Sequence, residues 1–451
     1  METCCASVAA TCLEPKMPVS TDNKTTRRAV VVAGNRTPFV KAFSEYLELD
    51  TIALGVEAVR GLLARTDLDT TKIDGVIWGG VLLPSLAPNV AREIVLDLDL
   101  PVSVEANTVT RACASGLQAI TDAVAKIERG EADVIIAGGS DSTSNATLAM
   151  PEEFVRSVAP FAMGRTSGPA GFFGMMGAFL PPTKALPKMP KVAERTTGEV
   201  MGESAEKMAQ INNISRESQD ELAARSHHRA AAAWDNGIYD NEVTPVTVNG
   251  NTVERDTIVR GNTSVEKMAK LRSAFAKDGT LTAANSSTLT DGASATLIMS
   301  EEKAKELGFT PLAAFKSWAY SGVDPKDQLL KGPALSMPKA LDRAGLTLAD
   351  VDLVDMHEAF AAQVLSILSM LEDAGFAKNE LGQDSAVGAV DPDTLNVHGG
   401  SVALGHPFAA TGSRMVNTVA HELHRSGKKT ALLGICAAGG LGAAAVLERV
   451  E

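Results

Sequence analysis

The chain has 451 residues, 45% hydrophobic and 22% charged, a balance typical of globular proteins with a large buried core. This length exceeds what one ordinary core supports, so we expect two or three domains. The formal net charge of −13 argues against a broad nucleic-acid-binding surface, so an anionic ligand would need a local cluster of lysine and arginine residues.

The chain begins with a stretch, residues 1–27, that reads as a poorly ordered tail and holds Cys4, Cys5 and Cys12. Five cysteines spaced this unevenly do not form a disulfide framework, and none pairs with histidine at a convincing metal-ligand spacing. We therefore predict a reducing, cytoplasmic setting and no metal site. The long uncharged runs are broken by glycine, so no transmembrane segment is expected.

Short buried strands then alternate with helices. Continuous apolar strands of this kind are typical of a mostly parallel α/β sheet covered on both faces. The expected strands are 29–33, 72–79 and 133–139, with helices at 51–64 and from residue 88.

Residues 107–116 (N-T-V-T-R-A-C-A-S-G) predict a strand-to-helix turn that carries Cys113. Apolar residues recur at helical spacing from Leu117 to Ile127, and Gly130 can end that helix. A thiol at a helix N-terminus among small residues is expected to have a lowered pKa and to be nucleophilic. The alternative is a buried cysteine that packs as a small hydrophobic residue.

The pattern changes between residues 146 and 283. The segment 161–198 is rich in Gly, Pro, Met and Phe without periodicity, which we interpret as loops laid over a site. Helices are expected at 204–209 and 215–234, the second with Ser215 as a possible N-cap. We predict an inserted loop domain, 146–283, within an N-terminal half made of 28–145 plus 284–305.

The α/β pattern resumes in a C-terminal half, residues 306–451. Its expected strands are 311–318, 351–356 and 429–435, and its expected helices are 335–344, 361–374 and 413–426.

The two halves resemble each other. The strand at Asp74 aligns with the strand at Asp352, and the step from Gly116 to Ser140 spans 24 positions, as does the step from Gly412 to Cys436. Equal spacing predicts a duplicated unit facing its copy, although helix–strand units share a typical length. A pseudo-twofold arrangement would gather four side chains: Cys113, His357, His406 and Cys436.

Those four residues lie in short motifs that together resemble the thiolase family from about Arg28 to the C-terminus. The motifs are T-R-A-C-A-S-G, M-H-E-A-F-A, G-G-S-V-A-L-G-H-P-F-A-A-T-G and G-I-C-A-A-G-G-L-G. The resemblance implies a duplicated five-layer α/β/α/β/α fold. It also implies an acyltransferase that cleaves 3-oxoacyl-CoA with coenzyme A by a ping-pong, reversible Claisen reaction, as in fatty-acid β-oxidation. The sequence His-Glu-Ala-Phe resembles the branch that includes the β subunit of the trifunctional fatty-acid oxidation complex.

The resemblance implies that Cys113 is the nucleophile, His406 its base and Cys436 the second acid/base. It implies one oxyanion hole from His406 and a water held at His357, and a second from the backbone N–H groups of Cys113 and Ala438. Most relatives have Asn where His357 stands, so its part in proton transfer stays open. Taken singly, each histidine could be a core or helix-capping residue, and Cys436 could fill a tight strand end.

For coenzyme A, a substrate rather than a cofactor, the resemblance implies a set of contacting residues: Arg260, Ser287, Ala283, Leu289 and Met201. A basic cluster at Lys267, Lys270 and Arg272 could meet phosphates or be a solvated helix face.

Other functions remain open. One is a biosynthetic acetoacetyl-CoA thiolase; another is an acyl-carrier-protein-dependent condensing enzyme, which Cys436 disfavours. A non-catalytic lipid carrier would lack one of the reactive residues, and none is missing. The family implies a homodimer or homotetramer, and the insertion could dock a hydratase/dehydrogenase α-subunit.

Overall fold

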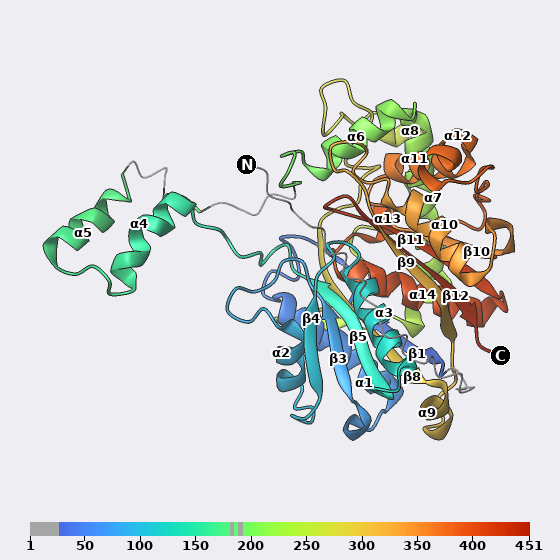
Figure 1. Cartoon of the computed structure of the whole chain (residues 1–451), viewed down its shortest axis with the longest axis horizontal. Coiled ribbons are helices and arrows are strands. Elements are labelled where there is room, and N and C mark those ends of the chain that lie inside the picture. The colour runs from blue at the N-terminus through green and yellow to red at the C-terminus, as the bar shows by residue number, and fades with distance from the viewer. Residues whose placement is uncertain (1–26, 181–184, 188–192) are drawn as a thin grey trace, which may run out of the picture.

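The computed structural model describes residues 27–180, 185–187 and 193–451. The chain forms two α/β halves, blue to cyan and orange to red in Figure 1, and one helical hairpin projects from them. The tail predicted at 1–27 lies outside the described residues except for Arg27. Among the described helices, none combines the length and apolar character needed to cross a membrane.

A single mixed sheet runs through both halves in the order β10-β11-β12-β9-β1-β8-β5-β3-β4, and the two-residue β2 pairs with β8. The two halves join where β1 pairs with β9. The strands are β1 (Ala29–Arg36), β2 (Val40–Lys41), β3 (Gly75–Gly79), β4 (Glu105–Val109), β5 (Val134–Asp141), β8 (Thr290–Ser300), β9 (Ala313–Gly322), β10 (Leu353–Met356), β11 (Thr430–Ala437) and β12 (Leu441–Arg449).

The expectation of a mostly parallel sheet is wrong. Only β3 with β4, β3 with β5, and β10 with β11 pair in parallel within this sheet, and the other pairings are antiparallel. Strands β3, β5 and β8 are buried along their whole length, as their apolar sequences predict. Apolar content reports burial on both faces, and it carries no information about strand direction.

The predicted duplication is visible in the strand order, where β3-β5-β8-β1 is repeated as β10-β11-β12-β9. The aligned aspartates make equivalent hydrogen bonds in the two halves. Asp74 accepts hydrogen bonds from the backbone N–H groups that open β5, and Asp352 accepts them from those that open β11.

The middle layer consists of α3 (Ser115–Glu128) and α14 (Ala410–Ser426), which pack on each other between the two halves of the sheet. Their contact requires glycine: a Cβ on Gly116 would lie 2.3 Å from the carbonyl oxygen of Ala409. On the outer faces, α1 (Thr51–Thr66) and α2 (Val90–Asp97) cover one half, and α10 (Gly332–Ala344) and α11 (Ala361–Glu372) cover the other. This gives the five layers α/β/α/β/α.

The remaining elements lie mainly in the insertion, where α7 begins after Ser215, whose side chain accepts a hydrogen bond from the Ser218 N–H as predicted. The insertion contains α4 (Glu152–Ala162), α5 (Gly168–Gly177), α6 (Met201–Ile211), α7 (Arg216–Asp235), β6 (Val246–Val248), β7 (Asn251–Val253) and α8 (Val265–Met268). Elsewhere lie the short helices α9 (Glu301–Glu306), α12 (Ala374–Phe376) and α13 (Ser401–Leu404).

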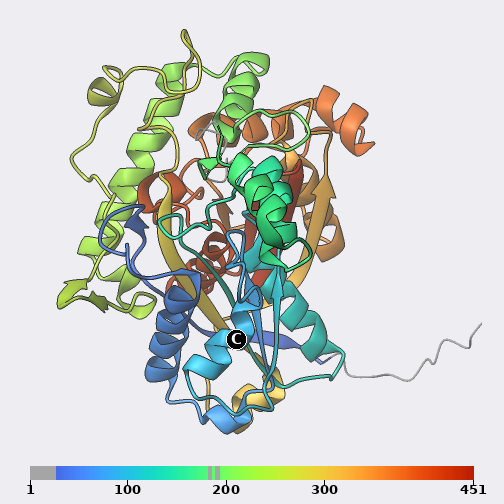
Figure 2. The same ribbon diagram turned by 90° about the vertical axis from the view of Figure 1, so that its left-hand side faces the viewer.

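The interpretation of 161–198 as loops over a site is wrong where the chain is helical, at the end of α4 (Glu152–Ala162) and along α5 (Gly168–Gly177). Helices α4 and α5 form the hairpin that projects from the body and points toward the viewer in Figure 2. They contact each other through aromatic edges, such as Phe161 against Phe172 at 6.5 Å between ring centroids. Helix α5 is glycine-rich and apolar on all sides, so its sequence carries no helical periodicity to predict it.

Candidate active site

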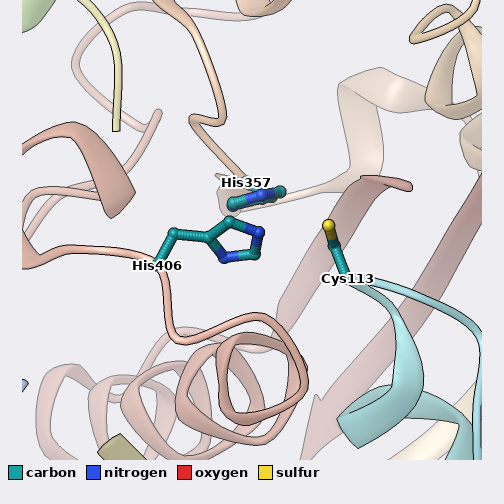
Figure 3. A group of neighbouring side chains, drawn as sticks. All are labelled: Cys113, His357 and His406. Atoms are coloured by element: carbon teal, nitrogen blue, oxygen red, sulfur yellow. The ribbon is translucent and has the colours of Figure 1, made fainter. Parts of the chain in front are cut away.

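Three segments of the chain meet at one point: the turn after β4, the residues after β10 and the segment before α14. One donor atom each of Cys113, His357 and His406 lies within 4.8 Å of the others. The two imidazole centroids are 4.1 Å apart, and Figure 3 shows the sulfur of Cys113 across from both rings. Residues from both halves of the chain therefore meet here.

Cys113 lies on a tight turn between β4 and α3. Ala112 has a left-handed backbone (φ 45°), which is uncommon for a residue other than glycine. The Ser115 hydroxyl closes the turn: it accepts a hydrogen bond from the Arg111 N–H at 2.7 Å and donates one to the Ala112 carbonyl at 2.6 Å. The turn holds the thiol just ahead of the first residue of α3.

The surroundings of Cys113 favour the neutral thiol. Burial of the sulfur raises the pKa of Cys113 to about 12, and a hydrogen bond from the Ala438 N–H acts in the opposite direction. The expected lowering of the pKa by the helix N-terminus is therefore wrong for the resting site, because desolvation outweighs the nearby N–H groups. A nucleophilic attack by this sulfur would need a base next to it.

Two neutral imidazoles stand next to that thiol. Burial, and then the charge of Arg414, lower the pKa of His406 to about 3. Burial, the neighbouring His406 and Arg414 also lower the pKa of His357 well below its usual value. Both rings are therefore uncharged near neutral pH.

Each imidazole is held by a hydroxyl through Nδ1. His406 Nδ1 lies 2.6 Å from Thr411 Oγ1, and His357 Nδ1 lies 2.8 Å from Ser401 Oγ. Both Nε2 atoms are buried and have no hydrogen-bond partner among the described residues. When Nδ1 donates to its hydroxyl, Nε2 presents a lone pair that can take a proton.

Cys436 completes the group near the end of β11, and its side chain is 1% exposed. Burial, and then the neighbouring Cys113, raise the pKa of Cys436 well above its usual value. The structure therefore brings together all four side chains that the duplication predicted, and both sulfurs are thiols at rest.

The predicted coenzyme A loop lies directly against the histidines. The Ser287 N–H donates to the Ala359 carbonyl at 2.9 Å, and the His406 N–H donates to the Thr288 carbonyl at 3.3 Å. Leu289 forms a bridge with His406 and remains 41% exposed. A ligand lying along this loop would reach the imidazoles.

The other predicted contacts lie on or beside the insertion. Met201 is the first residue of α6 and is half-buried, whereas Ala283 and Arg260 are exposed. The backbone N–H of Arg260 donates to His227 Nδ1 at 3.2 Å. Arg272, from the predicted basic cluster, lines an open surface hollow with Phe275 and Lys277.

Sequence reasoning did not identify the hydroxyls that hold the histidines. Ser401 and Thr411 stand five positions before and after His406, and this symmetric spacing was the available signal. Sequence reasoning also did not identify Glu194, whose carboxylate accepts a hydrogen bond from the Gly439 N–H at 3.0 Å.

The thiol and two imidazoles also form a donor set that could hold a metal ion such as Zn²⁺. The two Nε2 atoms and the thiol equally suit proton transfer to and from a sulfur nucleophile.

Comparisons with known proteins agree with this geometry. The model of the family described as "Thiolase, N-terminal domain" matches residues 29–302, and that of "Thiolase, C-terminal domain" matches residues 309–449. A "3-ketoacyl-CoA thiolase" of Aeromonas salmonicida is 44% identical over 96% of this chain and 99% of its own length. Another of that name, from Serratia proteamaculans, is 45% identical over 93% of this chain and 97% of its own length.

Solved structures show the same fold. The human mitochondrial 3-ketoacyl-CoA thiolase in complex with CoA matches with a TM-score of 0.79 and 32% identity, covering 94% of this chain and 98% of its own. The Bacillus anthracis acetyl-CoA acetyltransferase matches with a TM-score of 0.80 and 30% identity, covering 94% and 99%.

Proposed function

The chain belongs to the thiolase family, and from that premise we propose that it cleaves 3-oxoacyl-CoA with coenzyme A to give acetyl-CoA and an acyl-CoA shortened by two carbons. The observation that carries this proposal is the convergence of the Cys113 thiol with His357 and His406 beside Cys436. An acyl-cysteine reaction needs a nucleophile, a base next to it and a second proton carrier.

In the first half-reaction, His406 Nε2 takes the thiol proton as the sulfur of Cys113 attacks the 3-oxo carbonyl carbon. The resulting oxyanion lies by the backbone N–H groups of Cys113 and Ala438. The bond between C2 and C3 then breaks, and its electron pair becomes the enolate of acetyl-CoA. Cys436 protonates that carbanion, so acetyl-CoA leaves and Cys113 carries the shortened acyl group.

The second half-reaction restores Cys113, His406 and Cys436 to their starting protonation states. The Cys436 thiolate takes the proton of the coenzyme A thiol, whose sulfur attacks the acyl-Cys113 carbonyl. The Cys113 sulfur leaves and recovers its proton from the imidazolium of His406. The high pKa of both thiols matters here, because a thiolate whose conjugate thiol has a high pKa is a strong base and readily accepts the next proton.

His357 is assigned to the enolate oxygen. Its Nδ1 is fixed by Ser401, and its Nε2 is directed into the same small space as that of His406. The Ser401 hydroxyl accepts a hydrogen bond from Arg414 and can donate to His357 Nδ1, so that His357 Nε2 carries the hydrogen. That N–H can position a water or hold the thioester oxygen as negative charge develops. His357, which stands where most relatives have Asn, would therefore act as a hydrogen-bond donor and not as an additional proton carrier.

The biosynthetic alternative, acetoacetyl-CoA synthesis, uses the same four side chains in reverse. The relatives named 3-ketoacyl-CoA thiolase, at 44–45% identity over most of the chain, favour cleavage. An acyl-carrier-protein-dependent condensing enzyme or a lipid carrier is disfavoured by the presence of Cys436 in the site.

The further parts of the proposal rest on the family resemblance. Coenzyme A and acyl-CoA would contact a set of residues consisting of Arg260, Ser287, Ala283, Leu289 and Met201. The position of the 285–289 loop against both histidine loops supports this assignment. We also propose a cytoplasmic homodimer or homotetramer that needs no metal or prosthetic group, with a hydratase/dehydrogenase α-subunit as the candidate partner of the insertion.

A thiolysis assay tests the activity. We expect coenzyme A-dependent loss of 3-oxoacyl-CoA over a range of chain lengths; activity on acetoacetyl-CoA alone would favour the biosynthetic alternative. Cys113→Ala should abolish acyl-enzyme formation, as seen by intact mass. Cys436→Ala should still be acylated by a simple acyl-CoA, because coenzyme A can leave as a thiolate without a proton from Cys436. Cleavage should fall by about 10²-fold or more, because the far more basic enolate of acetyl-CoA needs that proton. Equal loss of both steps in Cys436→Ala would contradict its assigned role.

A further inference from the structure

A buried carboxylate joins the insertion to the tip of the β11–β12 hairpin. Glu194 is 9% exposed, and its Oε2 accepts a hydrogen bond from the Gly439 N–H at 3.0 Å. Its Oε1 accepts from the Thr196 N–H at 3.2 Å and from the Thr196 hydroxyl at 2.9 Å. Both oxygens are therefore engaged, which fixes the direction of the carboxylate.

The tip that Glu194 holds carries a donor of the active site. Gly439 and Gly440 have φ of 84° and 69°, so the chain reverses through two left-handed residues. On the other side, the carbonyl of Gly440 accepts from the Val323 N–H at 2.7 Å. Ala438, directly before the tip, directs its N–H at the sulfur of Cys113.

The loop that presents Glu194 is itself closed. The N–H of Glu194 donates to the Glu199 carbonyl, and its own carbonyl accepts from the Gly198 N–H, both at 2.8 Å. The Ser204 hydroxyl of α6 donates to the Glu199 carboxylate at 3.1 Å, which ties the loop to that helix. Helix α6 packs into the hydrophobic cluster of the C-terminal half. Hydrogen bonds and packing therefore connect the core, through α6 and the loop that carries Glu194, to the tip of the β11–β12 hairpin.

We propose that Glu194 is a positioning residue that sets the Ala438 N–H in the oxyanion hole by holding Gly439. This rests on the proposed function, because the donor matters only if an oxyanion forms at the acylated Cys113. Loss of one oxyanion donor costs about 10²–10³ in rate, so a displaced donor should cost on the order of tenfold.

The proposed role of Glu194 depends on its hydrogen bond to Gly439 and not on its negative charge. A negative carboxylate near an oxyanion gives no electrostatic benefit, so only its acceptor oxygen can help. Hydrogen bonds from Thr196 and Gly439 outweigh burial and keep the pKa of Glu194 below its usual value. Replacement by glutamine removes the charge and keeps an acceptor, whereas alanine removes both.

The test measures the rate at which an acyl-CoA acylates Cys113, followed by quenched-flow intact mass in the full chain. We expect Glu194→Ala to be about tenfold slower with little change in the acyl-CoA concentration that gives half-maximal rate. Glu194→Gln should stay within about twofold of wild type. The matched control is Arg195→Ala, which removes an exposed side chain from the same loop without altering the contacts of Glu194 or Glu199, and it should also stay within about twofold.

Three outcomes would overturn the inference: an unchanged rate in folded Glu194→Ala, a glutamine variant as slow as the alanine variant, or an equal loss in Arg195→Ala. If Glu194→Ala does not fold, Thr196→Val removes the hydroxyl bond to Glu194 Oε1, leaves the backbone N–H bond, and should slow acylation about twofold to threefold; no change would count against the inference. Absence of acylation in the wild-type protein would instead contradict the proposed function.

Discussion

The ionisation of Cys113 offers a sharp test of how the site is activated. Burial raises its pKa from 9.0 to about 12. At about 1.4 kcal/mol per pKa unit, the protein opposes ionisation of this thiol by about 4 kcal/mol relative to a thiol in water. At pH 8 only about 10⁻⁴ of the enzyme would carry the thiolate at rest.

The assay compares two reactions of the same sulfur between pH 6 and 9. Alkylation by iodoacetamide requires a thiolate and should rise about tenfold per pH unit without a plateau. Acylation by an acyl-CoA should be nearly flat, because His406, with a pKa of about 3, stays an unprotonated base and Cys113 stays a thiol throughout. Peptide mass spectrometry reports the modification at Cys113 specifically.

The control is Cys113→Ala, which sets the background from the other cysteines. A plateau in alkylation with a midpoint between pH 6 and 8 would mean a preformed thiolate–imidazolium pair. That result would refute the conclusion that desolvation outweighs the helix N-terminus at this turn.

Further outcomes follow from the same contacts. Ser401→Ala leaves His357 Nδ1 without its partner and should lower the thiolysis rate about tenfold with little change in unfolding temperature. Gly116→Ala places a Cβ 2.3 Å from a backbone oxygen and should destabilise the fold by about 2 kcal/mol or more in chemical denaturation, whereas Gly322→Ala meets open space and should not. Zn²⁺ should inhibit by occupying Cys113 and the histidines, and EDTA should leave activity intact; loss of activity on chelation would show a required metal.

Much of the architecture was predictable from the sequence because its signals are local. Apolar runs located β3, β5 and β11, the Ser215 cap located the start of α7, and Gly345 marked the end of α10 with its left-handed backbone. The internal spacing of 24 positions and four short motifs indicated which side chains would meet. Each of these depends on neighbours along the chain, so no tertiary information was needed.

Strand direction, the projecting helical hairpin and the protonation of Cys113 came only from the tertiary structure. The pKa of that thiol depends on how much protein surrounds the sulfur, which outweighs the helix end that the sequence revealed. Likewise, the hydrogen bonds of Ser401 with His357 and of Glu194 with Gly439 form only once distant segments lie against each other. Sequence patterns report periodicity and backbone preference, whereas desolvation and long-range hydrogen bonds arise from contacts between residues far apart along the chain.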